Sequence, residues 1–381
     1  MTGYIGIGGK AKKVKSIYVG VGGVAKKVKK GYIGVGGVAK LWYSSQKELS
    51  YYGSTTLFAV AHLAGASVGN YAIFAGGQVS GTFEVISRSA NITSAVRAYN
   101  TALVLSSATA LAKARTKLSG ATAGAGNYAV FSGGEIYDDT TVYIDAYNSS
   151  LTRTSTTGKY AHVCSAGASV GSYALFAGGY YSTYDSNTTA VNGSLTLSYP
   201  TKLSAARSEL AGASVGDYAL FAGGKTATST YSKVVDAYNS SLSQSTPTAL
   251  VSTRRQLAGA SVGNYALFAG GRGGSTGQTT VWAYNKSLTR STPTALSVGR
   301  SYLAGASVPD YALFAGGFTT LYTGLTAVQA YDSSLVRSEP TSLSSGRGAL
   351  AGASVGDYAL FAGGYSDANG FSNVVDVYQA V

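Results

Sequence analysis

Short apolar runs, each bounded by glycine or by Asn, Asp and Ser, recur along most of this chain. One unit contains such runs at residues 210–215, 218–222 and 234–238, followed by a Ser- and Thr-rich stretch at 242–248. A Gly-Asp pair, a Gly-Gly pair and an Asn-Ser-Ser turn fall near the breaks between them. Short runs between turn residues indicate strands rather than helices. The unit therefore predicts a four-stranded antiparallel sheet, whose strands we name a to d in chain order.

The second of these strands belongs to a block, Tyr-Ala-x-Phe-(Ala/Ser)-Gly-Gly, that occurs seven times at intervals of 45 to 57 residues. A repeat of this length, made of strands and turns, is typical of β-propeller blades. We therefore predict an all-β, seven-bladed β-propeller. The small residues of strand a suit a crowded central channel, and the glycines after strand b permit positive φ. The blocks begin at Tyr71, Tyr128, Tyr173, Tyr218, Tyr265, Tyr311 and Tyr358.

The two ends of the repeat array complement each other. The seventh unit ends just after its strand c, without a strand d, whereas a spare d-like segment precedes the first unit. Leu49 and Leu57 in this segment have the same spacing as Leu242 and Leu250 in a complete unit. We expect residues 47–56 to pair with residues 372–379, which would close the ring and leave no open sheet edge.

A shorter repeat occupies the first 43 residues. Residues 4–9, 18–23 and 32–37 share the pattern Tyr-(Ile/Val)-Gly-(Ile/Val)-Gly-Gly, and each is followed by an Ala-Lys pair. A strand, a Gly-Gly pair and a second extended run predict a β-hairpin. We expect a small basic β-hairpin module over residues 1–43 and the propeller over residues 44–381. Because an isolated hairpin is marginally stable, the module is expected to lean on a partner, on another copy or on the propeller.

The positive charge is concentrated in this module. The net charge is +13, yet nine lysines and no acidic residue lie in the first 40 residues, which leaves +4 for the rest. A solvated strand face is one interpretation of these lysines, and contact with an acidic partner surface is the other. Specific nucleic-acid binding is not expected, because few aromatic residues alternate with them. The predicted attachment residues are Lys12, Lys13, Lys15, Lys26, Lys27, Lys29 and Lys30.

Residues 47–381 resemble the kelch-repeat propellers. The resemblance rests on the double glycine after strand b, the tyrosine of strand c and an arginine shortly before strand a. The chain departs from the kelch pattern in strand d, where Ser- and Thr-rich sequence replaces the usual tryptophan. The arginines are Arg115, Arg207, Arg254, Arg300 and Arg347.

The N-terminal repeats resemble a segment at the start of phage and prophage structural proteins of Gram-positive bacteria. This resemblance implies a tail or head fibre type of virion appendage. Residues 1–43 would dock to other virion proteins, and the propeller would be displayed.

Cysteine usage and segment hydropathy bear on location. Cys164 is the only cysteine, so no internal disulfide forms. No signal peptide and no apolar run of membrane-spanning length is evident. We expect synthesis in a bacterial cytoplasm and a final location in a virion, without membrane insertion.

Few residues offer catalytic or metal-binding chemistry. His62 and His162 have no neighbouring ligands at metal-binding spacing, and the Cys164–His162 pair alone is weak. Asp138 and Asp139 form an acidic pair that is interpreted as a solvated loop. We expect no cofactor, no metal and no catalysis.

The loops between strands b and c supply the predicted binding surface. In an antiparallel blade the b–c and d–a loops emerge on the same face, and here they vary between units. Tyrosine beside Ser, Thr, Asp and Asn suits an adaptable binding face, and aromatic rings also suit sugars. Ordinary polar loops are the alternative. The candidate ligand-binding residues are Tyr137, Tyr180, Tyr181, Tyr184, Tyr231, Phe318, Tyr322, Tyr365 and Phe371.

The sequence thus favours a non-enzymatic appendage that binds a host-surface glycan or protein, with a homo-oligomer left open. A purely structural virion decoration protein is one alternative, and an intracellular kelch-type adaptor is another. A glycan-acting hydrolase is the alternative of another class. It would require three or more acids to converge near the pore from the set Glu84, Glu135, Asp138, Asp139, Asp185 and Asp367.

Overall fold

The computed structural model describes residues 48–381, apart from Ile86, Ala161 and Leu321, and the strand backbone of three hairpins within residues 4–44. The chain divides into two compact units. One comprises Met1–Ser50 with Ala380–Val381, and the other comprises Tyr51–Gln379.

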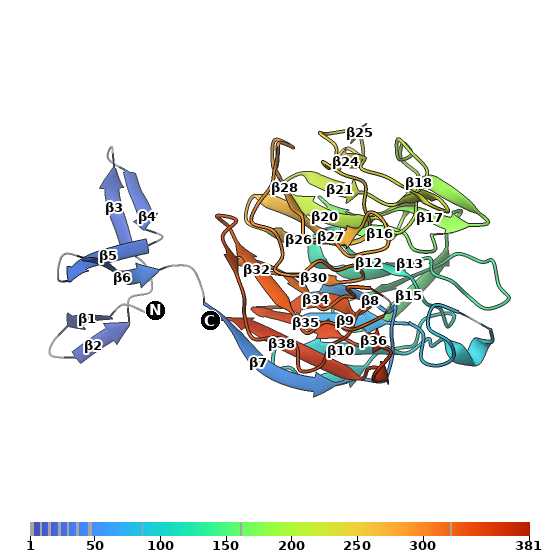
Figure 1. Ribbon diagram of the computed structural model, residues 1–381, viewed down its shortest axis with the longest axis horizontal. Coiled ribbons are helices and arrows are strands. Elements are labelled where there is room, and N and C mark those ends of the chain that lie inside the picture. The colour runs from blue at the N-terminus through green and yellow to red at the C-terminus, as the bar shows by residue number, and fades with distance from the viewer. Residues whose placement is uncertain are drawn as a thin grey trace. The chain divides into compact units, whose positions relative to one another are not determined.

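The larger unit is a seven-bladed β-propeller, as predicted (Figure 1). Seven four-stranded antiparallel sheets follow one another along the chain. Among the described residues the only helical segments are the 3-10 turns η1 (Ser89–Asn91) and η2 (Gly124–Gly126). None of the described helical residues forms a segment long and apolar enough to cross a bilayer.

Each blade contributes its strands in the predicted order. The a strands are β8 (Ala64–Val68), β12 (Ser119–Ala123), β16 (Ala166–Val170), β20 (Ala211–Val215), β26 (Arg255–Val262), β30 (Ala304–Val308) and β34 (Ala351–Val355). The b strands are β9 (Tyr71–Ala75), β13 (Tyr128–Ser132), β17 (Tyr173–Tyr181), β21 (Tyr218–Ala222), β27 (Tyr265–Arg272), β31 (Tyr311–Ala315) and β35 (Tyr358–Ala362).

The outer strands are more variable in length. The c strands are β10 (Val96–Asn100), β14 (Tyr143–Tyr147), β18 (Thr183–Val191), β24 (Val235–Asn239), β28 (Val281–Asn285), β32 (Val328–Asp332) and β38 (Val374–Ala380). The d strands are β11 (Leu105–Ser107), β15 (Arg153–Thr157), β19 (Leu197–Ser198), β25 (Gln244–Ser245), β29 (Arg290–Ser291), β33 (Arg337–Ser338) and β7 (Leu49–Thr56). Small hairpins extend two b–c loops, namely β22 (Lys225–Ala227) with β23 (Thr230–Tyr231) and β36 (Tyr365–Ser366) with β37 (Gly370–Phe371).

The predicted closure of the ring is confirmed. Strand β7 is the outermost strand of the seventh blade and lies beside β38 (Figure 1). The hydroxyl of Tyr51 on β7 donates to Asp376 Oδ1 on β38 at 2.8 Å, and the ring of Tyr51 packs edge-on against Tyr378. The pairing leaves no open edge between the first and the last blade.

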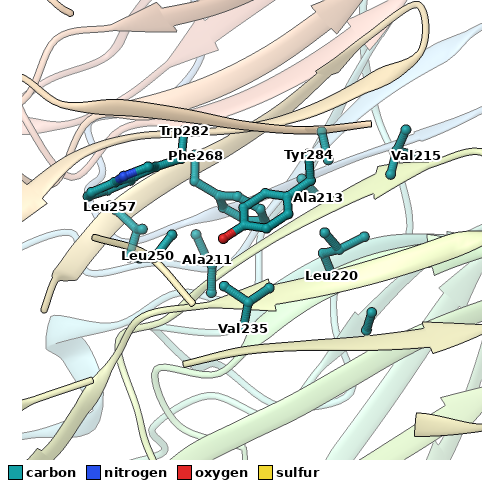
Figure 2. Close-up of a cluster of buried hydrophobic side chains, with 13 residues drawn as sticks. Ala211, Ala213, Val215, Leu220, Val235, Leu250, Leu257, Phe268, Trp282 and Tyr284 are labelled. Atoms are coloured by element: carbon teal, nitrogen blue, oxygen red, sulfur yellow. The ribbon is translucent and has the colours of Figure 1, made fainter. Parts of the chain in front are cut away.

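The core lies between adjacent blades. Figure 2 shows one such cluster, in which Phe268, Trp282 and Tyr284 of the fifth blade pack against Leu220 and Val235 of the fourth. The strand c tyrosines are fully buried, and each donates its hydroxyl to a backbone carbonyl of the preceding blade's d–a segment. Each tyrosine therefore contributes apolar area without leaving a polar group unpaired. These tyrosines are Tyr99, Tyr147, Tyr238, Tyr284, Tyr331 and Tyr378.

The double glycines have the predicted positive φ at all seven positions. A Cβ at Gly223 would lie 2.7 Å from the carbonyl oxygen of Arg254 in the next blade. The N–H of Gly224 donates to that same oxygen at 2.7 Å, and Gly364 makes the equivalent bond to Val60 across the ring closure. A side chain at Gly223 would force the two blades apart, so glycine is required there.

The arginine before strand a is buried in its own blade. Arg207 pairs with Asp236 at 2.5 Å, and Arg115 pairs with Asp145 at 2.7 Å, with all four side chains excluded from solvent. In the third blade His162 occupies this position and hydrogen bonds to Gly178 and Thr189. In the first blade Val60 stands at the position of this arginine, and Arg97 stands at the position of its aspartate partner. The basic group of this blade therefore lies on strand c.

The N-terminal repeats form three separate antiparallel hairpins, as predicted. They are β1 (Tyr4–Ile7) with β2 (Lys10–Lys13), β3 (Ile17–Val21) with β4 (Val24–Val28), and β5 (Lys30–Val35) with β6 (Val38–Ser44). Of the predicted attachment residues, Lys12, Lys13, Lys26, Lys27 and Lys30 lie in these strands. Lys15 and Lys29 lie outside the described residues.

Candidate functional site

One residue in each d–a connection forms a ring at the mouth of the central channel. Each of the seven has φ between 53° and 56°, a left-handed conformation. Each also donates its backbone N–H to the carbonyl of the equivalent residue in the preceding blade, over 2.8–3.1 Å. The last bond runs from His62 to Ala349 and closes the circle. The ring consists of His62, Lys117, Cys164, Glu209, Gln256, Tyr302 and Ala349.

All seven side chains line a cavity of about 430 Å³, which we call the mouth cavity. Glu84 and Lys225 reach it from b–c loops, and Arg255 reaches it from the start of β26. The b–c and d–a connections therefore share one face, as predicted. This volume lies in the usual range of small-molecule sites.

The channel has a different lining from its mouth. Glycine, alanine and serine or threonine of the seven a strands enclose about 230 Å³. The hydroxyls link neighbouring blades, for example from Ser214 Oγ to Ser169 O at 2.7 Å. The channel thus offers small, mutually bonded groups, whereas the mouth offers long and charged ones.

Opposite charges are paired around the mouth cavity. Arg255 Nη1 lies 2.7 Å from Glu209 Oε2, and Lys117 Nζ lies 2.8 Å from Glu135 Oε2. Burial alone would lower the pKa of Lys117, but the acidic groups around it, Glu135 among them, raise that pKa. Lys225 also lines the mouth cavity, and its ammonium group makes no ion pair with any described residue.

Glu84 comes from the long b–c loop of the first blade. The side chain of Gln78 holds this loop, donating to the carbonyls of Thr82 and Val85 and accepting from the N–H of Glu84. Burial acts to raise the pKa of Glu84, but hydroxyl groups of Tyr302 and Tyr322 donate to its carboxylate and lower that pKa overall. Glu84 is therefore held as a carboxylate.

Two further titratable groups of the ring remain neutral near pH 7. Burial lowers the pKa of His62 to about 4, and Phe83 stacks on its ring at 4.9 Å. Burial raises the pKa of the Cys164 thiol to about 12. Cys164 therefore lacks the thiolate character of a reactive cysteine.

Three of the predicted tyrosines border a second hollow, which we call the side groove. Tyr180, Tyr181 and Tyr184 belong to the β17–β18 hairpin and line a space of about 550 Å³. The rings of Tyr180 and Tyr184 pack edge-on at 5.1 Å. Tyr180 and Tyr181 are 44% and 50% exposed, so their rings are accessible to a ligand.

Four other predicted aromatic residues pack with one another instead. Phe83 stacks on Tyr365 at 4.3 Å and contacts Phe318 and Tyr322, while Phe371 packs on Tyr365. We call this group the aromatic wall. Phe318 is only 1% exposed, so it supports the wall and presents no ring face to solvent. The burial of Phe318 could not be predicted from the sequence, because Phe83, the side chain at the centre of the aromatic wall, lies outside the repeat pattern.

The two remaining tyrosines lie apart from each other. Tyr137 is exposed in the b–c loop of the second blade. Tyr231 lies on β23, where the guanidinium of Arg255 sits 5.2 Å from its ring centre. Tyr231 therefore supports the arginine that pairs with Glu209.

The acids named for a hydrolase do not gather at one point. Glu84 lines the mouth cavity and Glu135 lines the side groove. Asp139 faces Lys113, and Asp185 accepts hydrogen bonds from Asn187 in its own hairpin. Neither Asp138 nor Asp367 is among the residues that line these two spaces. Nowhere in the described part of the chain do three His, Cys, Asp or Glu side chains form a group that could hold a metal ion.

Sequence reasoning missed most of the ring. Lys117, Glu209, Gln256 and Tyr302 stand at one equivalent position, immediately before the first residue of the strand a motif. Because the side chain differs in every repeat, no motif marks the position. The only available signal was that the amino acid at this position differs between repeats, whereas the neighbouring positions are regular.

Comparisons with known proteins support the fold alone. No protein-family model matches the chain, and no curated protein sequence matches it. The fold is similar to a solved structure titled "Structure of YjhT", with a TM-score of 0.57 and 12% sequence identity. The match covers 75% of this chain and 98% of that chain. A likeness at this identity supports the propeller architecture and says nothing about activity.

Proposed function

We propose that this chain is a non-enzymatic binding protein of a phage or prophage particle, and that the b–c/d–a face of its propeller binds a host-surface glycan. Residues 1–43 would attach it to other virion proteins, as the resemblance of the N-terminal repeats implies. Several displayed copies would strengthen a weak single-site affinity.

The exposed tyrosines beside a charged cavity carry this proposal. Tyr180 and Tyr181 offer apolar ring faces, and the adjoining walls supply carboxylate, ammonium and guanidinium groups at fixed positions. Sugars combine apolar ring faces with many hydroxyls, and this mixture of surfaces complements both.

The state of the carboxylates favours binding over hydrolysis. A glycosidase needs one carboxyl of raised pKa to protonate the leaving group. Glu84 has a lowered pKa, and Glu135 and Glu209 are paired with Lys117 and Arg255. These carboxylates are suited to accept hydrogen bonds from sugar hydroxyls.

The test is binding of the full chain to a printed glycan array and to whole bacterial cells. We expect the double variant Tyr180→Ala, Tyr181→Ala to bind at least about tenfold more weakly, a loss of about 1.4 kcal/mol. Tyr199→Ala is the matched control, because Tyr199 is 41% exposed, directly follows β19 and lines neither hollow.

The alternatives predict other outcomes. A folded chain that decorates particles but binds neither glycans nor cells would indicate structural decoration. Release of reducing sugar from a bound glycan would indicate a hydrolase. Unchanged binding by the double variant would remove the tyrosine face from the proposal.

A further inference from the structure

The mouth cavity and the side groove adjoin each other, and we call the two together the path. The two spaces share four lining residues, which come from three blades, so they lie directly beside each other. The shared residues are Lys117, Cys164, Glu209 and Lys225.

The path is blocked on the opposite side. There the aromatic wall stands behind Glu84 and Tyr302, with Phe83 and Phe318 both buried. The hydroxyls of Tyr302 and Tyr322 bond to the same carboxylate and tie the long loop to the sixth blade. A bound chain therefore cannot continue through this side, and the groove past Tyr180 is the lined exit.

Buried polar atoms without hydrogen-bond partners belong to residues that line the mouth cavity. Gln256 is 7% exposed and lines the cavity, and its side-chain Oε1 has no hydrogen-bond partner among the described residues. Arg255 Nε and His62 Nε2 also lack partners. A buried polar atom without a partner costs free energy that an incoming hydroxyl can recover.

We infer that the mouth cavity binds the terminal unit of a glycan, and that the following units leave through the side groove over Tyr180, Tyr181 and Tyr184. Gln256, Arg255 and Glu84 would bond to the hydroxyls of the terminal unit, and Lys225 would contact the same unit from the side next to the groove. This inference rests on the proposed function and assigns it a direction, with the chain end inserted first.

The first test uses the full chain on a printed array that carries each oligosaccharide twice. One form has its non-reducing end free, and the other has that end extended by a further, different sugar. We expect the extension to reduce binding at least about tenfold, since the blocked side leaves no space beyond the terminal unit. Equal binding of both forms would overturn the inference while leaving glycan binding intact. No binding to any glycan would remove the proposed function and this inference together.

The second test separates the two spaces. The probes are the best array oligosaccharide and the methyl glycoside of its terminal unit, with affinities measured by titration calorimetry. Gln256→Leu should weaken both probes by a similar factor, about tenfold or more, because it removes a contact to the shared terminal unit. The double variant Tyr180→Ala, Tyr181→Ala should weaken only the oligosaccharide.

Controls keep this test interpretable. Tyr199→Ala should change neither affinity, and thermal melting checks that each variant folds. Lys225→Met serves as a second variant in case Gln256→Leu is unstable, and it should also weaken both probes. If the tyrosine variant weakened the monosaccharide probe as strongly as the oligosaccharide, the two-space assignment would be wrong.

Discussion

Two rings of seven residues lie close together in this propeller, and their sequences behave in opposite ways. In strand a, one channel position is glycine in every blade. In the ring at the mouth, all seven residues differ although φ and the backbone hydrogen bond are the same. The channel glycines are Gly65, Gly120, Gly167, Gly212, Gly259, Gly305 and Gly352.

The contrast follows from what surrounds each position. A Cβ at Gly259 would lie 2.1 Å from the carbonyl oxygen of Gly212, and every channel glycine has an equivalent neighbour. At the mouth the side chains line a cavity, and backbone hydrogen bonds form the ring. Regularity in this repeat therefore reflects packing between blades, and it is lost where side chains line a cavity.

The largest effect is expected where a repeated charged pair is buried. Asp236→Ala leaves the guanidinium of Arg207 without its carboxylate inside the fourth blade. We expect a loss of about 3–5 kcal/mol in the free energy of unfolding, measured by urea denaturation. Asp217→Ala, in an exposed turn of the same blade, is the control and should change stability by less than about 0.5 kcal/mol. Similar effects of the two variants would contradict the role of the pair.

A smaller loss is expected in the channel ring. Gly259→Ala forces a methyl group against the neighbouring blade and should cost about 1–3 kcal/mol, again by urea denaturation. Gly274→Ala is matched in chemistry, but nothing lies within 4 Å of its Cβ position. If Gly259→Ala proved as mild as Gly274→Ala, packing would not explain the uniform glycines.

The smallest effect at neutral pH belongs to the mouth ring, where His62→Gln should change stability little. The difference should appear in acid. Between pH 6.5 and 4 the unfolded chain binds a proton at His62 but the folded chain does not, so stability falls as pH falls. The full loss, on the order of 3 kcal/mol, is reached below pH 4.

The measurement is the unfolding free energy of both proteins across this pH range. The variant should lose less stability than the parent between pH 6.5 and 4. His162, whose pKa burial also lowers, is present in both proteins, so its contribution cancels. Identical pH slopes would show that His62 is not held neutral in the folded state.

The architecture could be predicted from the sequence because the same strand pattern is repeated seven times. Blade number, strand order and closure by β7 all follow from the spacing of the repeated segments, and the Gly-Gly pairs predict positive φ. The role of Phe83 could not be predicted, because a single residue in a long loop gives no periodic signal. The burial of Phe318 and the grouping of Gln256 with Glu84 depend on the three-dimensional ring.

The circle of hydrogen bonds at the mouth also limits which amino acids can occupy it. At every position the backbone N–H donates a hydrogen bond to the neighbouring residue of the ring, so proline is excluded. A left-handed φ also disfavours β-branched side chains. The residues present obey both restrictions. Within them the backbone hydrogen bonds are the same whatever the side chain, although the rings of His62 and Tyr302 pack edge-on against each other. The mouth thus combines one uniform backbone frame with seven different side chains.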